Sequence, residues 1–171
     1  NLCNLSCRSC GSMFSSNWYD DQVALWGKPD HPKVTYAGTT KMDAYEQLVE
    51  YLPLVEQVYF AGGEPLIMEE HYKILKELIR LGKADTVRLI YNTNFTRQAY
   101  KDLNVFDYWP EFKDVSVGAS LDAMGPRAEL MRNGTKWLDV EHNRETMLKK
   151  CPKVDFYISP TVGIFNYSHV I

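Results

Sequence analysis

Three cysteines near the start of the chain, Cys3, Cys7 and Cys10, carry the clearest chemical signal in the sequence. Their C-x3-C-x2-C spacing could place three thiolates around one metal cluster. A four-iron, four-sulfur cluster is usually held by four cysteine thiolates. Three thiolates would therefore leave one iron without a protein ligand, and that iron could bind a substrate or a cofactor.

Zinc and thiol chemistry are alternatives that the same cysteines leave open. Cys7 and Cys10 form a C-x2-C pair, which in an intracellular protein can hold zinc or act as a redox dithiol. A structural zinc site needs further ligands; the nearest imidazole is that of His31, and no second C-x2-C pair follows. The triad could also form a disulfide or remain unligated. Cys151 is expected to be an ordinary thiol, partly buried or on the surface.

The composition is typical of a soluble globular domain and excludes several classes of protein. The formal net charge is −3, so the chain has no general basic field for nucleic acid or for an anionic membrane. No apolar run approaches the length of about 18 residues that a membrane-spanning helix needs. Three crowded cysteines do not make the dispersed framework of a secreted disulfide protein, so we expect a cytoplasmic location.

Short apolar runs alternate with helical patterns along the chain, which predicts an α/β fold. Helical periodicity covers residues 69–81 and 137–148. Strands are predicted at residues 57–61, 86–91, 114–119 and 154–162. Strand-helix-strand units of this kind form parallel sheets with the helices outside, so we expect about four parallel strands.

The segments between these elements are less regular. Residues 11–40 are rich in Gly, Ser, Asp, Pro and Lys, which predicts an irregular insertion packed by its aromatic side chains. A short helix is expected near residues 97–103. Another helix, capped by Thr40, would present one apolar face made of Met42, Tyr45, Leu48, Val49 and Leu52. Solvated helix faces are expected to carry His71, His142, Glu69 and Glu70.

Polar or glycine-rich clusters follow three of the predicted strands. They are Gly62-Gly63-Glu64-Pro65, Asn92-Thr93-Asn94 and Ser120-Leu121-Asp122. In parallel barrels the loops at the carboxyl ends of the strands build the site. Each cluster also has an ordinary interpretation, because glycine and proline are common in turns and asparagine readily caps its own turn.

In this order the motifs resemble those of the radical S-adenosylmethionine (radical SAM) enzymes. The segment from Cys3 to Cys10 is similar to the cluster loop of that family, and Gly62-Gly63-Glu64 to its Gly-Gly-Glu motif. Cys-Arg-Ser-Cys-Gly, Tyr-Asn-Thr-Asn, Ser-Leu-Asp-Ala and Arg-Asn-Gly-Thr-Lys-Trp resemble the subgroup that carries a twitch or SPASM domain. The chain departs from the family at Ser9, where an aromatic residue is common, and at Phe95 and Ala123, where glycine is common.

The resemblance implies a fold, two cofactors and a set of site residues. The fold is an incomplete (β/α)6 TIM-like partial barrel. Cys3, Cys7 and Cys10 would hold a 4Fe-4S cluster whose open iron is chelated by S-adenosylmethionine, and Tyr91 would face the site. The residues implied to contact S-adenosylmethionine are Gly62, Gly63, Glu64, Asn94, Ser120, Asp122, Arg132 and Val162.

The resemblance also implies a reaction. A reduced cluster would donate one electron to S-adenosylmethionine, giving a 5′-deoxyadenosyl radical that abstracts hydrogen from the substrate. A peptide or protein is the leading substrate class. A nucleoside or another small molecule is the alternative within this chemistry, and a non-catalytic zinc or iron-sulfur binding module is the alternative outside it.

The expected partners follow from the same resemblance. We expect an electron donor such as flavodoxin or ferredoxin, and neither a membrane nor a nucleic acid. Residues 1–171 are expected to be the radical SAM core domain of a longer protein. The remainder would supply the first barrel strand, the last strands, and a twitch or SPASM domain with an auxiliary iron-sulfur cluster.

Overall fold

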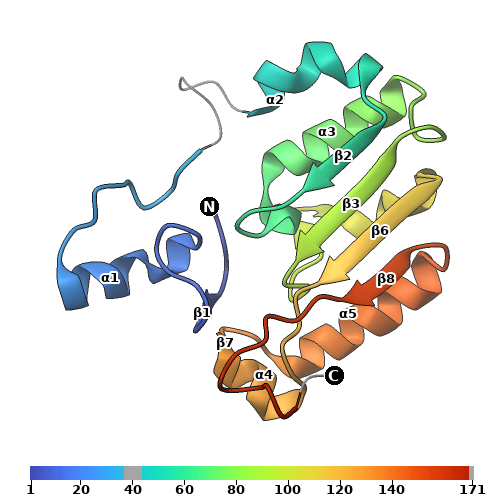
Figure 1. Ribbon diagram of the computed structural model, residues 1–171. Coiled ribbons are helices and arrows are strands. Elements are labelled where there is room, and N and C mark those ends of the chain that lie inside the picture. Colours follow the sequence, from blue (N-terminus) through green and yellow to red (C-terminus); the bar gives the residue numbers. More distant parts are fainter. Residues whose placement is uncertain (37–43, 170–171) are drawn as a thin grey trace.

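The computed structural model describes residues 1–36 and 44–169, and its centre is a parallel β-sheet (Figure 1). Every neighbouring pair of strands in this sheet is parallel. The strand order is β2 (Gln57–Phe60), β3 (Arg88–Thr93), β6 (Asp114–Ala119) and β8 (Asp155–Ile158). The prediction of an α/β fold with four parallel strands is therefore confirmed.

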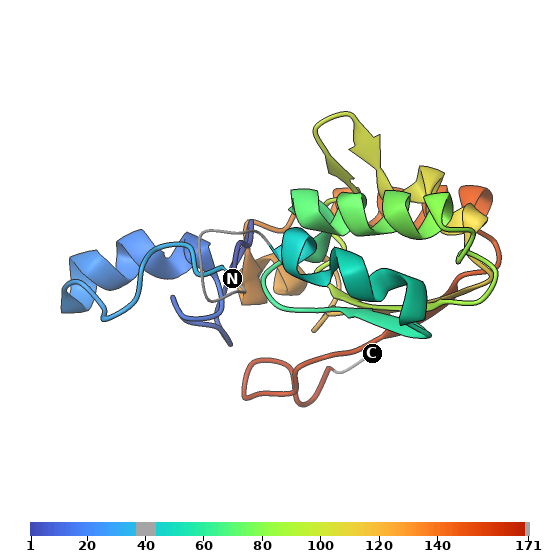
Figure 2. The ribbon, with the colours of Figure 1, turned by 90° about the horizontal axis from the view of Figure 1, so that it is seen from above.

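Two long helices cover one face of this sheet. Seen from above, α3 (Glu69–Arg80) and α5 (Trp137–Lys150) lie on the same side of the strands (Figure 2). Ile74, Leu75 and Leu78 of α3 are buried, as expected for an apolar stripe that recurs every three to four residues. Both helices were predicted from this periodicity, and their observed bounds agree with the prediction to within two residues.

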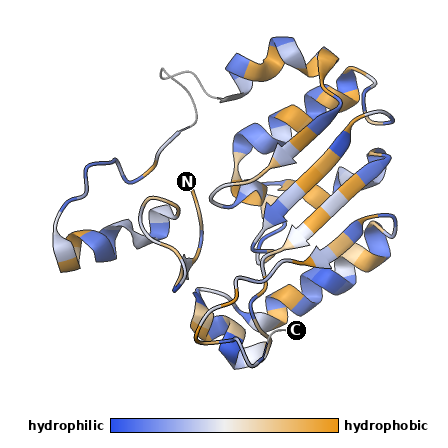
Figure 3. Cartoon of the chain, in the orientation of Figure 1, coloured by the Kyte–Doolittle hydropathy of each residue, from blue (hydrophilic) through white to orange (hydrophobic). Residues whose placement is uncertain are grey.

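The core lies between the helices and the sheet. Apolar residues are concentrated in the two central strands, β3 and β6 (Figure 3). Because side chains alternate along a strand, one set of them points at the helices. That set is fully or almost fully buried and includes Leu89, Tyr91, Val115 and Val117. Within the described part of the chain, no helix of this kind packs against the opposite face of the sheet (Figure 2).

Residues 11–36 are more regular than predicted. They contain a 3-10 turn (Ser16–Trp18) followed by α1 (Tyr19–Trp26), whose first turn carries Asp20 and Asp21. Acidic residues there favour the helix because they interact with its positive N-terminal end. The indole of Trp26 is 74% exposed and does not pack the segment as expected. The proposed cap at Thr40 lies outside the described residues.

The following helix is shorter than its apolar pattern suggested. The structure has α2 (Ala44–Leu48), which continues as a 3-10 segment (Val49–Leu54). Pro53 lies inside that segment, where its missing N–H ends regular hydrogen bonding. Of the predicted apolar face, Leu52 is buried, Leu48 is exposed, and Met42 lies outside the described residues.

Residues 97–103 do not form the short helix that was predicted. Instead, β4 (Ala99–Tyr100) and β5 (Leu103–Asn104) pair as an antiparallel hairpin. Lys101, at the turn, has a φ of 51°, and this left-handed conformation cannot continue an α-helix. Two 3-10 turns (Val105–Asp107 and Trp109–Glu111) lead on to β6.

A second antiparallel pair of strands joins the N-terminal segment to a segment far along the sequence. β1 (Ser6–Cys7) pairs with β7 (Arg132–Asn133), which follows α4 (Gly125–Met131). The N-terminal segment consequently lies in front of the arrowheads of the parallel strands (Figure 1). Among the described residues, no helix has the length and apolar character needed to cross a membrane.

Candidate cofactor site

The three cysteines line one cavity at the carboxyl ends of the parallel strands. Its volume is about 180 Å³, and Phe14, Ser15, Asn92 and Thr93 form part of its wall. The structure also brings to this cavity most of the residues singled out in the sequence, namely Cys3, Cys7, Cys10, Gly62, Gly63, Asn94, Ser120 and Arg132. Glu64, Asp122 and Val162 are not part of its lining.

Gly63 lets the segment that precedes Cys3 lie directly against the end of β2. The Glu64 backbone N–H donates a hydrogen bond of 2.7 Å to the Leu2 carbonyl oxygen. Gly63 has a φ of +46°, and a Cβ atom there would lie 2.0 Å from the same oxygen. Gly63, which was expected to contact S-adenosylmethionine, therefore makes its close contact with the Leu2 backbone beside the first cysteine. Gly62 has a φ of +81° and open space around it.

Glu64 is fully buried behind this loop and joins the ends of β2 and β3. Its carboxylate accepts hydrogen bonds from the Thr93 hydroxyl and the Asn94 N–H, each at 2.7 Å, and from the Leu66 N–H at 3.1 Å. Burial raises the pKa of Glu64 to about 7, although these hydrogen bonds act in the opposite direction. The carboxylate positions the Thr93-Asn94 loop from behind.

Asn94 connects that loop to the cysteine segment. Its side-chain amide donates to the Asn4 Oδ1 at 2.9 Å and to the Cys3 sulfur at 3.9 Å. The next residue, Phe95, has a left-handed φ of 58° and is buried, and its N–H donates to the Thr93 hydroxyl at 3.0 Å. Phe95 stands where the resembled family has glycine. The backbone at this position adopts the left-handed conformation that glycine favours, and the phenylalanine side chain packs in the core.

Arg132 faces the cavity and is held from behind by Asp122. The two form a bidentate ion pair, with nitrogen–oxygen distances of 2.7 and 2.9 Å, and both side chains are largely buried. Burial opposes the charge on Arg132, but Asp122, together with Cys7 and Cys10, favours it, and the pKa of the guanidinium is raised. Asp122 also accepts a hydrogen bond of 2.8 Å from the Thr161 N–H. A carboxylate bound on both sides in this way fixes the direction of the guanidinium.

The pairing of β1 with β7 places Cys7 opposite Arg132. One guanidinium nitrogen lies 3.7 Å from the Cys7 sulfur. A hydrogen bond between the thiols of Cys7 and Cys10 raises the pKa of Cys7 and lowers that of Cys10, and Arg132 favours the thiolate of both. Burial raises the pKa of Cys3. The thiolate is the form of cysteine that binds metal, and Cys10 is the residue that most readily supplies it.

The sequence did not single out the side chains that hold the cysteine loop in shape. The Trp18 indole N–H donates to the Cys7 carbonyl at 2.8 Å. The Ser15 hydroxyl donates to the Leu5 carbonyl at 2.6 Å, and the Ser16 hydroxyl accepts from the Cys3 N–H at 3.2 Å. Serine readily bonds nearby backbone, but no motif in this stretch shows which carbonyl it reaches.

Several residues lie elsewhere than expected. Tyr91, expected to face the site, is fully buried under α3, where its hydroxyl is 3.0 Å from the Nε2 of His71. His71, expected on a solvated face, is 2% exposed, and burial lowers its pKa to about 3. His142 is exposed, as expected. Val162 is 58% exposed in the segment after β8. Ala123, in the place of a family glycine, is buried without a left-handed φ.

The cavity offers sulfur donors, which suit a thiolate-bound metal or cluster. In residues 1–36 and 44–169, no three His, Cys, Asp or Glu side chains are arranged to hold one metal ion. Of the residues that the structure describes, three sulfur donors line the cavity and no carboxylate does. Thiolates are the ligands of iron-sulfur clusters and of zinc, whereas magnesium and calcium need oxygen ligands.

Comparison with known proteins identifies a shared fold. No protein-family model and no curated protein matches the chain. The solved structure of native anSMEcpe with bound AdoMet (S-adenosylmethionine) and Cp18Cys peptide is similar, with a TM-score of 0.53 and 22% sequence identity. The similarity covers 91% of this chain and 39% of that one, so the chain spans about two fifths of that protein's length.

Proposed function

We propose that the protein is a radical S-adenosylmethionine enzyme that acts on a peptide or protein. The observation that carries the proposal is the single cavity that Cys3, Cys7 and Cys10 share with the loops following three parallel strands. Independent support comes from anSMEcpe, which has the same fold and was solved with S-adenosylmethionine and a peptide bound.

In this proposal Cys3, Cys7 and Cys10 hold a 4Fe-4S cluster. When bound, the reduced cluster supplies the electron for reductive cleavage of S-adenosylmethionine, which generates the species that abstracts hydrogen from the substrate. Cys10 is the most exposed of the three cysteines, so an electron donor such as flavodoxin or ferredoxin would approach from its side.

The other cavity residues would bind and orient S-adenosylmethionine. Arg132 presents a guanidinium whose orientation is fixed by Asp122, which suits the methionine carboxylate. Asn94 and Ser120 offer short polar side chains, and Gly62 leaves room for close approach. Asp122 acts through Arg132, and Glu64 acts through the Thr93-Asn94 loop, because neither carboxylate lines the cavity.

Metal analysis separates this proposal from a zinc-binding module. The chain is reconstituted anaerobically with iron and sulfide, and iron, sulfide and zinc are then quantified for the wild type, Cys7→Ala and Cys151→Ala. Cys151 is the matched control, because its buried thiol bonds the Phe106 carbonyl and does not line the cavity. We expect about four irons per chain in the wild type and the control, and a loss of iron in Cys7→Ala. Zinc without iron in all three proteins would contradict the proposal.

A further inference from the structure

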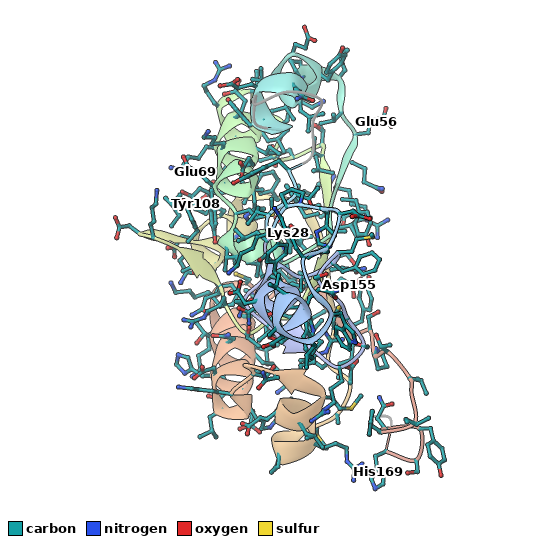
Figure 4. All side chains as sticks on the ribbon, turned by 90° about the vertical axis from the view of Figure 1, so that its left-hand side faces the viewer. Lys28, Glu56, Glu69, Tyr108, Asp155 and His169 are labelled. Carbon is teal, nitrogen blue, oxygen red and sulfur yellow. The ribbon has the colours of Figure 1, made fainter. Side chains whose placement is uncertain are left out.

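A row of uncharged hydrogen-bonding side chains crosses the sheet on the face away from α3 and α5. Figure 4 separates the two faces, with Glu56 and Asp155 on the open side and Glu69 and Tyr108 on the helix side. The row begins in the wall of the cysteine cavity with Asn92 of β3. The Asn92 amide nitrogen donates a hydrogen bond of 2.7 Å to the hydroxyl of Tyr59 on β2, which lies opposite Ile90 in the register and is reached diagonally.

Gly118 of β6 makes room for the other half of the row. In the register of the sheet, Gly118 lies between Asn92 and Tyr157 of β8. A Cβ atom at Gly118 would be 2.9 Å from both the Cζ and the hydroxyl oxygen of Tyr157, and 3.0 Å from the Asn92 Oδ1. The φ of Gly118 is not left-handed, so the glycine provides space and not an unusual backbone conformation. The Tyr157 phenol can therefore lie across β6, toward Asn92.

The side chains of the row can still form hydrogen bonds to a ligand. Tyr59 and Tyr157 are 55% and 42% exposed. In residues 1–36 and 44–169, the Tyr157 hydroxyl has no hydrogen-bond partner, and the Asn92 Oδ1 accepts no hydrogen bond. Asp155, two residues before Tyr157 on β8, is already occupied, because its carboxylate accepts a hydrogen bond of 3.0 Å from the Ser116 hydroxyl. What remains is a phenolic donor and an amide acceptor, both uncharged.

We infer that Tyr59, Asn92 and Tyr157 position the substrate, and that they do so by binding a backbone amide of a peptide. The inference rests on the proposed function and adds the residues that would orient its substrate. An amide group offers one donor and one acceptor, which matches the Asn92 Oδ1 and the Tyr157 O–H. Because Asn92 also lines the cysteine cavity, a peptide bound along this row lies next to the proposed site of hydrogen abstraction.

Peptide selection by the reconstituted holoprotein, with S-adenosylmethionine present, tests the inference. The probe is a randomised peptide library, from which retained peptides are identified by mass spectrometry and the most enriched one is synthesised. Tyr157→Phe and Asn92→Ala are compared with the wild type and with Tyr51→Phe. Tyr51 is a suitable control because it is 54% exposed, like Tyr59, but lies outside the row and the cavity.

We expect Tyr157→Phe to raise KM for the enriched peptide about tenfold with kcat nearly unchanged, the effect of losing one hydrogen bond made equally in the ground and transition states. Asn92→Ala should raise KM at least as much, and Tyr51→Phe should match the wild type. Unchanged KM in both row variants would overturn the inference, as would a wild-type protein that retains no peptide. If the wild type retains peptides and the two row variants retain fewer, but S-adenosylmethionine is not cleaved, only the proposed reaction fails.

Discussion

The substitution Gly63→Ala tests the contact between the Leu2 backbone and the end of β2, which places the first cysteine next to the sheet. The new methyl carbon would lie 2.0 Å from the Leu2 carbonyl oxygen. Real contacts of this kind stay above about 3 Å, so the carbonyl must retreat by about 1 Å and the 2.7 Å hydrogen bond from the Glu64 N–H must break. Leu2 is next to Cys3, so the retreat also displaces a proposed cluster ligand.

The expected magnitude has two parts. A left-handed φ costs an alanine about 1 kcal/mol relative to glycine, and loss of the hydrogen bond costs about 1 kcal/mol more. Gly62→Ala is the matched control, because Gly62 also has a left-handed φ but its added Cβ would have no neighbour within 4 Å. Gly63→Ala should thus lower the free energy of unfolding by about 2 kcal/mol, and Gly62→Ala by about half as much.

Urea unfolding measures both variants, and iron retained after anaerobic reconstitution reports the effect on the cysteine loop. Gly63→Ala should retain clearly less iron than Gly62→Ala, since only Gly63→Ala displaces the segment next to Cys3. Equal stability and equal iron retention in the two variants would refute the argument that Gly63 is required for the approach of Leu2 to β2.

Two further predictions concern buried charged or titratable groups. Burial lowers the pKa of His71 from 6.5 to about 3, so the unfolded chain binds the proton first as the pH falls. The free energy of unfolding should therefore fall by up to about 1.4 kcal/mol per pH unit between about pH 6 and pH 4, and urea titrations of His71→Gln should lack this part of the slope. Arg132→Ala leaves the buried carboxylate of Asp122 without its cation and should lower the free energy of unfolding by about 3 kcal/mol. The exposed Arg144→Ala is its control, and equal urea midpoints would contradict the role of the ion pair.

The parallel sheet could be predicted because its signal is local. Each strand is a short apolar run, and β6 was predicted with its observed bounds, residues 114–119. Secondary-structure prediction failed where the local sequence was also compatible with another element. The apolar spacing near residues 97–103 fits one turn of helix, but pairing of Ala99–Tyr100 with Leu103–Asn104 decides the structure. His71 was misplaced because its polarity outweighed its position on the buried stripe of α3.

The site depends on contacts between residues far apart in the chain, which local patterns do not reveal. The sequence singled out the cysteines, Gly63 and Arg132 one by one. It did not predict that Cys7 pairs with Arg132 across two short strands, or that the Leu2 backbone occupies the space above Gly63. Nor did it separate Glu64 and Asp122, which are buried behind the cavity, from the residues that line it.

The central claim is that the cysteine cavity supports reductive cleavage of S-adenosylmethionine. Its most direct test is 5′-deoxyadenosine release by the anaerobically reconstituted protein under a strong reductant, with Cys7→Ala and Cys151→Ala measured in parallel. The account predicts release by the wild type and by Cys151→Ala, and none above background by Cys7→Ala. No release by a wild-type protein that carries an intact, reducible cluster would contradict it.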